Sequence, residues 1–155
     1  MKTLILYATK HGATEEIARR IAKHTDGTIH DLKSDNYPPL SDFDCIIIGS
    51  SLYAGMIRKE AKMFIEKNSE YIKDKKFGLF LCGLQENSTD EYFKTNFHAD
   101  IINSAKATSF LGGIFDPKKA GFMGRLVMKA VAKKADYVDT INDEKIGKFV
   151  AVLKD

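Results

Sequence analysis

The sequence has few of the residues that build a disulfide scaffold and none of the long apolar runs that cross a membrane. Its two cysteines, Cys45 and Cys82, are too few and too scattered for a disulfide framework or a zinc site. No apolar run approaches the roughly 18 residues of a membrane-spanning helix. The N-terminal residues also lack the apolar region and cleavage site of a signal peptide. We therefore expect a soluble, cytoplasmic protein.

A strong surplus of one charge is also missing. The chain has 24 Lys and Arg against 21 Asp and Glu, and its net charge of +3 falls short of a dedicated nucleic-acid-binding protein. The length of 155 residues and the 44% of hydrophobic residues are sufficient for one ordinary core. We expect one domain over residues 1–155 and no nucleic-acid partner.

Short apolar segments alternate with amphipathic ones along the chain. Fully apolar stretches such as CIIIG, residues 45–49, are typical of parallel strands that are covered on both faces. The predicted strands cover residues 3–8, 28–32, 45–49, 77–82 and 107–115. The predicted helices cover residues 14–24, 57–72, 91–105, 122–133 and 143–153. This alternation predicts an α/β protein with a five-stranded parallel sheet and helices on both faces.

The turn between the first strand and the first helix carries two threonines and a glycine, in the order Thr9-Lys10-His11-Gly12-Ala13-Thr14. In a parallel α/β sheet, ligands bind beyond the carboxyl ends of the strands, and the first N–H groups of a helix attract anions. Gly12 permits a tight backbone, and the hydroxyls of Thr9 and Thr14 add donors. The turn therefore predicts a phosphate site. The simpler alternative, in which Thr14 only caps the helix, leaves Thr9 and Gly12 unexplained.

The absence of other known phosphate-binding motifs narrows the class of phosphate site. Neither GxxxxGK[ST] nor GxGxxG is present, and no acidic pair follows the first strand as in a phosphoacceptor receiver domain. The pattern Thr-x-x-Gly-x-Thr instead resembles the phosphate loop of the flavodoxin-like family. The loops IIIGSSLYAG and FLCGLQENSTD follow the third and fourth strands, where that family encloses a flavin ring. The resemblance covers essentially the whole chain. It implies a flavodoxin-like three-layer sandwich with strand order 2-1-3-4-5 and flavin mononucleotide (FMN) as cofactor.

The resemblance assigns cofactor-binding roles to these three loops. The first would hold the phosphate, the second would line the ring and the third would close its other side. Tyr53 is the best candidate to stack on the ring, with an ordinary interfacial aromatic as the alternative. The chain has no Trp to supply the tryptophan platform of some flavodoxins. The residues expected to bind FMN are Thr9, Lys10, His11, Gly12, Ala13, Thr14, Ser50, Ser51, Leu52, Tyr53, Gly55, Gly83, Leu84 and Gln85.

Other reactive side chains do not yield a catalytic group. Cys82 would lie beside the flavin, but its apolar neighbours favour a buried structural thiol. A Cys45–Cys82 disulfide is not expected, because one residue begins its strand and the other ends its own. His98 is expected on a helix surface, and Asp116, which precedes a proline, is expected to shape a turn. No general base is identified.

The stretch PKKAGFMGRLVMKAVAKK, residues 117–134, contains basic residues and no acid. Such a helix near the flavin suits an anionic partner, either porphyrin carboxylates or the headgroups of a membrane. The simpler alternative is a helix that covers the sheet and keeps its lysines in water. Either interpretation requires a buried apolar stripe. The apolar residues that recur there at helical spacing are Phe122, Leu126, Val127, Ala130 and Val131.

The C-terminal third, LGGIFDPKKAGFMGRLVMKAVAKKADYVDT, together with MKTLIL and IIIGSS, resembles the menaquinone-dependent protoporphyrinogen oxidases. The resemblance implies dehydrogenation of a porphyrinogen, with electrons passing through FMN to a quinone and with peripheral membrane contact through residues 117–134. Two alternatives stay open. One is an electron carrier that serves a redox partner protein and has no substrate chemistry of its own. The other is a flavin-free binding module, against which the intact 9–14 loop argues.

Overall fold

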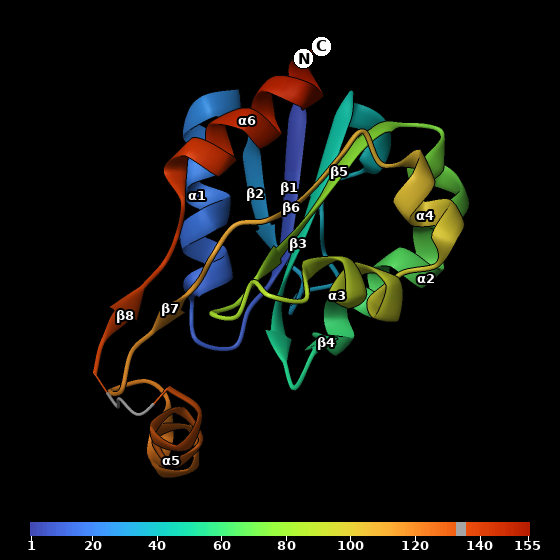
Figure 1. The fold of residues 1–155 in the computed structure, drawn as a ribbon. Coiled ribbons are helices and arrows are strands. Elements are labelled where there is room, and N and C mark those ends of the chain that lie inside the picture. The colour runs from blue at the N-terminus through green and yellow to red at the C-terminus, as the bar shows by residue number, and fades with distance from the viewer. Residues whose placement is uncertain (133–135) are drawn as a thin grey trace.

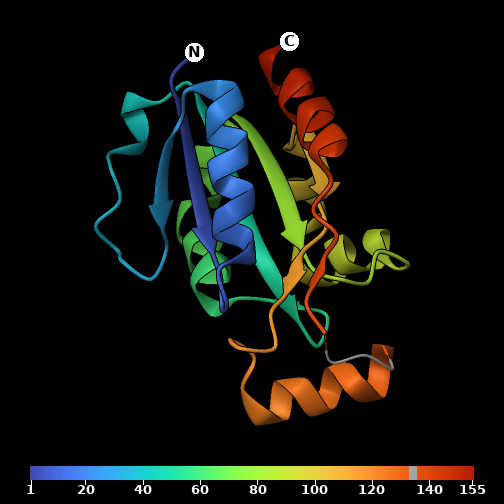
Figure 2. The ribbon, with the colours of Figure 1, turned by 90° about the vertical axis from the view of Figure 1, so that its left-hand side faces the viewer.

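The computed structural model describes residues 1–132 and 136–155, which form an open parallel sheet between two layers of helices (Figures 1 and 2). The pairings along the sheet are parallel, in the order β2-β1-β3-β5-β6. The strands are β1 (Thr3–Ala8), β2 (Thr28–Asp31), β3 (Cys45–Tyr53), β5 (Lys76–Cys82) and β6 (Ala107–Phe110). Numbered by these strands alone, the order is 2-1-3-4-5, as predicted.

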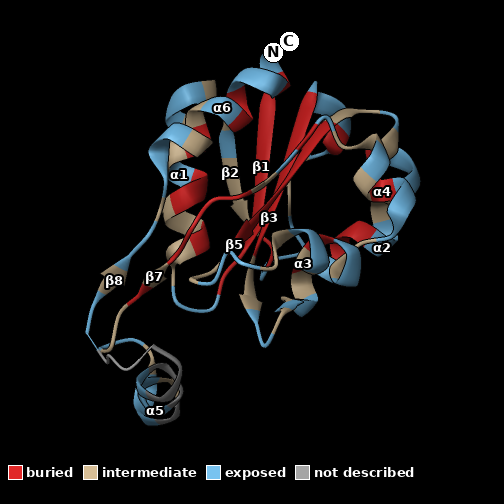
Figure 3. Ribbon diagram, in the orientation of Figure 1, coloured by how far each residue is buried: buried red, intermediate tan, exposed pale blue. Residues whose placement is uncertain are grey.

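Helices pack on both faces of the sheet over two buried clusters. On one face, Ile17 and Phe149 pack with Phe80; on the other, Phe64 packs with Phe77. The central strands are buried along both faces (Figure 3), which explains why their segments are continuous apolar runs. The first face carries α1 (Ala13–Thr25) and α6 (Asp143–Lys154), and the second carries α2 (Lys59–Lys73), α3 (Thr89–Asn96) and α4 (Ala99–Ser104).

The single helix expected over residues 91–105 is wrong, because the structure divides it into α3 and α4. Phe97 leaves the helical conformation, with φ −131° and ψ 144°, while its N–H donates to the carbonyl oxygen of Phe93. Its ring then packs on the ring of Phe93, with 5.7 Å between centroids. His98 follows as the exposed residue before α4. Packing of the second aromatic against the first therefore outweighs helix continuity.

The predicted fifth strand, 107–115, is also too long. β6 ends at Phe110, and Gly112 turns the chain with φ +86°. Beyond it, β7 (Ile114–Phe115) pairs antiparallel with β8 (Val138–Asp139), and α5 (Gly121–Ala132) lies between them. We call residues 114–139 the excursion. A Cβ on Gly112 would lie 2.0 Å from the carbonyl oxygen of Thr140, so the base of the excursion requires glycine there.

The excursion carries α5 away from the sheet, beyond the carboxyl ends of the strands (Figures 1 and 2). The alternative of a sheet-covering helix is therefore wrong, and so is the expected burial of its apolar stripe where the side chains are described. Phe122 is 69% exposed and Leu126 is 46% exposed. The side chains of Val127, Ala130 and Val131, and residues 133 and 134, lie outside the described part. Within that part, no helix combines the length and apolar character needed to cross a membrane.

Candidate functional site

The turn of residues 9–14 joins the end of β1 to α1 and leaves several donors without acceptors. Gly12 is the N-cap residue of α1, with φ 96° and ψ −6°, and its N–H donates to Oγ1 of Thr9 over 2.9 Å. The first helical bond runs from the Glu16 N–H to the Gly12 carbonyl oxygen over 3.0 Å. The N–H groups of residues 13–15 therefore have no acceptor within the helix. They stand at the positive end of its dipole, where an anion is stabilised.

Thr14 does not cap the helix, so the simpler alternative for this residue is wrong. Its side chain is fully buried, and Oγ1 has no hydrogen-bond partner among the described residues. Burial raises the pKa of the neighbouring Cys82 thiol to about 11, and the Thr14 hydroxyl beside it partly offsets this rise. A buried hydroxyl without a partner costs about 1–3 kcal/mol. The turn therefore fits a ligand that brings oxygen acceptors, as a phosphate does.

Positive charge gathers around the same turn. The pKa of His11 is lowered, first by burial and then by the charges of Lys10, Arg58 and Lys119. Arg58 precedes α2, and Lys119 belongs to the excursion, so three separate segments contribute. Sequence reasoning did not place Arg58 or Lys119 at the phosphate loop, because no local pattern signals which distant loops meet there.

The second loop is a tight hairpin. β3 turns back through Ala54 and Gly55, with φ +50° and +75°, into β4 (Met56–Ile57), which pairs antiparallel with β3. Two successive residues with positive φ are characteristic of a type I′ hairpin turn. Tyr53 stands at this turn and is 63% exposed.

Two side chains hold the hairpin in place, one from β3 and one from α3. Ser50 is buried; its Oγ accepts a hydrogen bond from the Arg58 N–H over 2.9 Å and donates to the Ser51 carbonyl oxygen over 3.0 Å. Asn96 accepts from the Ile57 N–H and donates to the Gly55 carbonyl oxygen, each over 2.8 Å. The hydroxyl of Ser50 thus organises the loop from within. Contact of Ser50, Ser51, Leu52, Tyr53 or Gly55 with FMN stays a prediction.

The third loop follows β5 and is fastened to the base of the excursion. Gly83 donates its N–H to the carbonyl oxygen of Gly112 over 3.0 Å, and a Cβ on Gly113 would lie 2.9 Å from the Gly83 carbonyl oxygen. Leu84 is half-buried and Gln85 is exposed. The structure therefore brings all three expected loops to the carboxyl edge of the sheet, with the excursion beside them.

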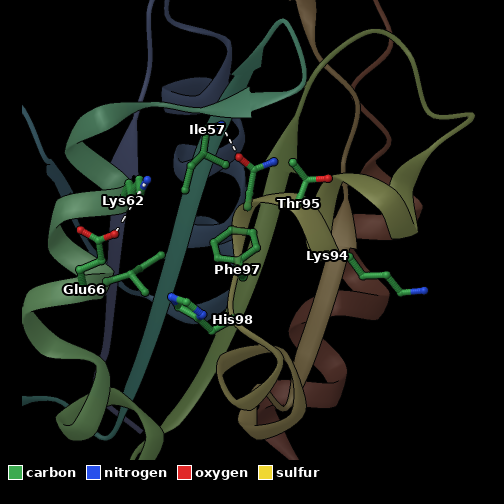
Figure 4. A pocket seen from close by; sticks show the side chains of 9 residues that line it. Ile57, Lys62, Glu66, Lys94, Thr95, Phe97 and His98 are labelled. Carbon is green, nitrogen blue, oxygen red and sulfur yellow. Dashed lines mark hydrogen bonds and ion pairs between the residues drawn. The ribbon is translucent and has the colours of Figure 1, made fainter.

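A cavity of about 360 Å³ lies elsewhere, between α2 and the α3–α4 segment (Figure 4). Ile57, Glu66 and His98 are among its lining residues, and none of the turn 9–14 or the loop 83–85 takes part. The hollow is therefore separate from the candidate site at the strand ends.

The remaining sequence expectations concern single side chains. Cys45 and Cys82 are both free and buried, and they stand at opposite ends of the β3–β5 register, which confirms that they do not form a disulfide. Asp116 shapes a turn as predicted, because its Oδ1 accepts from the Lys118 N–H over 2.9 Å. Among the described residues, no group of three His, Cys, Asp or Glu is arranged to hold a metal ion.

The sheet order and the three loops define an open, doubly wound α/β protein whose strand order reverses between β1 and β3, beside the turn 9–14. The chain belongs to the flavodoxin-domain family, whose model matches residues 4–141. It is also similar to an uncharacterised protein of Methanocaldococcus jannaschii. The two are 30% identical over 111 residues, which cover 71% of this chain and 69% of that protein.

Solved structures show the same fold at low sequence identity. Oxidised flavodoxin 2 of Bacillus cereus has a TM-score of 0.58 and 19% identity, over 99% of this chain and 98% of that one. A flavo di-iron protein of Thermotoga maritima has a TM-score of 0.60 and 14% identity, over 99% of this chain and 35% of that one. These likenesses establish the flavodoxin-like architecture, and membership of the flavodoxin-domain family supports the expectation of FMN.

Proposed function

We propose that this protein is an FMN-dependent oxidoreductase of the protoporphyrinogen oxidase type. The free N–H groups of residues 13–15 and the unpaired hydroxyl of Thr14 would hold the phosphate. The hairpin at Tyr53 and the loop at Gly83 would orient the ring. Bound FMN supplies the ability to accept electrons and pass them on. The protein supplies binding, orientation and positive charge.

The position of the excursion is the observation that carries this proposal beyond cofactor binding. Residues 117–134 contain no acid. The excursion places α5, which carries part of this basic stretch, beyond the strand ends instead of on the sheet (Figure 2). Arg125 and Lys129 are exposed, as are Phe122 and Leu126. A surface that combines cations with apolar side chains suits a reactant with carboxylates on an apolar ring system. It also suits the anionic surface of a membrane in which an apolar quinone is dissolved.

Oxidation of protoporphyrinogen tests the proposal. Protein loaded with FMN should oxidise protoporphyrinogen under argon when a quinone analogue is present, well above the rate without protein. Omission of the quinone should stop the reaction after the bound flavin is reduced. A rate equal to the uncatalysed background, in protein that demonstrably holds FMN, would contradict the oxidase type and leave cofactor binding intact.

An electron carrier is the second candidate, and one observation favours it. Among the residues expected around the ring, 50–55 and 83–85, Tyr53 is the only one with an ionisable side chain. A carrier needs no general acid or base. Dithionite titration that accumulates a stable one-electron-reduced flavin, together with rapid reduction by a ferredoxin-type reductase, would favour the carrier over the oxidase.

A further inference from the structure

Lys119 reaches the phosphate loop from the excursion. A Cβ placed on Gly12 would lie 3.8 Å from Nζ of Lys119. Apart from Gly12 and its two neighbours in sequence, no other described residue has an atom within 4 Å of that position. The ammonium group therefore stands directly over the glycine of the turn.

The backbone around Lys119 is held in a defined turn. The N–H groups of Lys119 and Ala120 donate to the Asp116 carbonyl oxygen over 3.0 and 3.1 Å. The Asp116 carboxylate receives the Lys118 N–H, and no described carboxylate lies within ion-pair distance of the Lys119 ammonium. The turn thus presents a cation that has no anionic partner within the part of the chain that the structure describes.

The phosphate loop offers the other half of such a site. The N–H groups of residues 13–15 lack helical acceptors, and Oγ1 of Thr14 is buried without a partner. The charge of Lys119 acts on a residue of this loop. It helps to lower the pKa of His11, although burial and the charges of Lys10 and Arg58 are larger causes. An anion seated on the turn would meet backbone donors from one side and the Lys119 ammonium from the other.

We propose that Lys119 binds the phosphate of FMN and that the cofactor thereby ties the excursion to the body of the protein. The inference rests on the proposed FMN site and names a residue that the turn itself does not contain. Coupling of this kind is reciprocal: the docked excursion strengthens FMN binding by the factor by which FMN strengthens docking. Riboflavin has the same ring and lacks the phosphate, so it separates this contact from contacts to the ring.

Binding of both flavins to four proteins tests the inference. The proteins are the wild type, Lys119→Gln, Lys119→Arg and the control Lys118→Gln, which alters the adjacent exposed lysine of the same turn. Flavin fluorescence quenching should show FMN binding weakened about tenfold in Lys119→Gln, with riboflavin binding unchanged. Lys119→Arg should retain most of the affinity, and Lys118→Gln all of it. An unchanged FMN affinity in Lys119→Gln, or an equal loss for both flavins, would overturn the inference.

Hydrogen exchange supplies a readout that does not depend on affinity. At saturation, FMN should slow amide exchange in α5, and riboflavin should not; in Lys119→Gln the effect of FMN should disappear. Equal protection by both flavins in the wild type would overturn the inference. If the wild type binds neither flavin, the cofactor proposal fails and this inference falls with it. If FMN binds equally well to Lys119→Gln, only the role of Lys119 fails.

Discussion

The ammonium of Lys10 lies 4.5 Å from the centroid of the Tyr53 ring and joins the phosphate turn to the tip of the β3–β4 hairpin. An exposed cation–π contact of this kind contributes about 0.5–1 kcal/mol. The contact holds together the two loops between which the flavin is expected. A flavin that stacks on Tyr53 must therefore either displace Lys10 or use the opposite face of the ring.

Replacement of Tyr53 tests its role as a stacking partner. Tyr53→Ala should weaken FMN and riboflavin alike, by several-fold up to about tenfold, because stacking involves the ring that both share. Tyr53→Phe keeps an aromatic face and is the matched control, with little expected loss. Titration by fluorescence quenching measures the affinities of the wild type and both variants for the two flavins. Unaltered binding by Tyr53→Ala would favour the alternative, in which Tyr53 is an ordinary interfacial aromatic residue.

Gly12 tests the phosphate turn itself. Its φ of +96° is unfavourable for a β-branched residue, so Gly12→Val should distort the turn and weaken FMN binding at least about tenfold. Gly147→Val is the control, since a Cβ there meets nothing within 4 Å and Gly147 lies in α6, away from the three loops. Circular dichroism should show both variants folded. FMN retention by Gly12→Val equal to that of the control would remove the phosphate role from the turn.

The basic face of α5 should govern association with anionic membranes. A variant with Arg125→Glu and Lys129→Glu should bind phosphatidylserine-containing vesicles on the order of 30-fold more weakly, at about 1 kcal/mol for each cation lost. The control, Lys23→Glu with Lys67→Glu, changes the net charge equally on α1 and α2. Vesicle sedimentation measures both. Equal partition of the wild type and the α5 variant would show that the helix is only a solvated surface.

His11 should make the stability of the cofactor-free protein depend on pH. Burial and then the charges of Lys10, Arg58 and Lys119 lower its pKa from the ordinary value of 6.5. As the pH falls through that range, the unfolded chain takes up a proton that the folded protein still refuses, so the free energy of unfolding decreases. Urea denaturation between about pH 7.5 and about pH 5 should show a smaller decrease in His11→Asn than in the wild type.

His24→Asn, at the exposed end of α1, is the control that removes one imidazole from another part of the chain. High salt should also reduce the slope, because it screens the repulsion between His11 and the neighbouring cations. If His11→Asn shows the same decrease as the wild type, the pH dependence arises elsewhere.

The strands and the phosphate turn were predictable because their signals are local. CIIIG and FGLFLC are continuous apolar runs, and the turn 9–14 places its glycine directly before a helix. The hairpin after β3 was not predicted, although Ala54-Gly55 stands at its turn, because β4 has only two residues and no periodicity. The break at Phe97 depends on packing against Phe93, which helical spacing alone does not reveal.

The excursion shows the limit of sequence patterns most clearly. Each of its two strands has two residues, and their pairing joins segments on either side of α5. The spacing of an amphipathic helix predicts a position on the sheet, whereas the structure places α5 beyond the carboxyl ends of the strands (Figures 1 and 2). Lys119 lies close to Gly12 because the excursion is placed there. It could be read only from the structure.

FMN bound at the carboxyl edge of the sheet underlies every proposed role of this protein. The decisive measurement is the absorption spectrum of protein purified without added flavin, followed by titration of the same protein with FMN. We expect flavin absorption bands, either at once or after addition of FMN, and release of FMN on denaturation. A colourless protein that refuses added FMN would contradict this expectation and show that the turn of residues 9–14 binds another ligand.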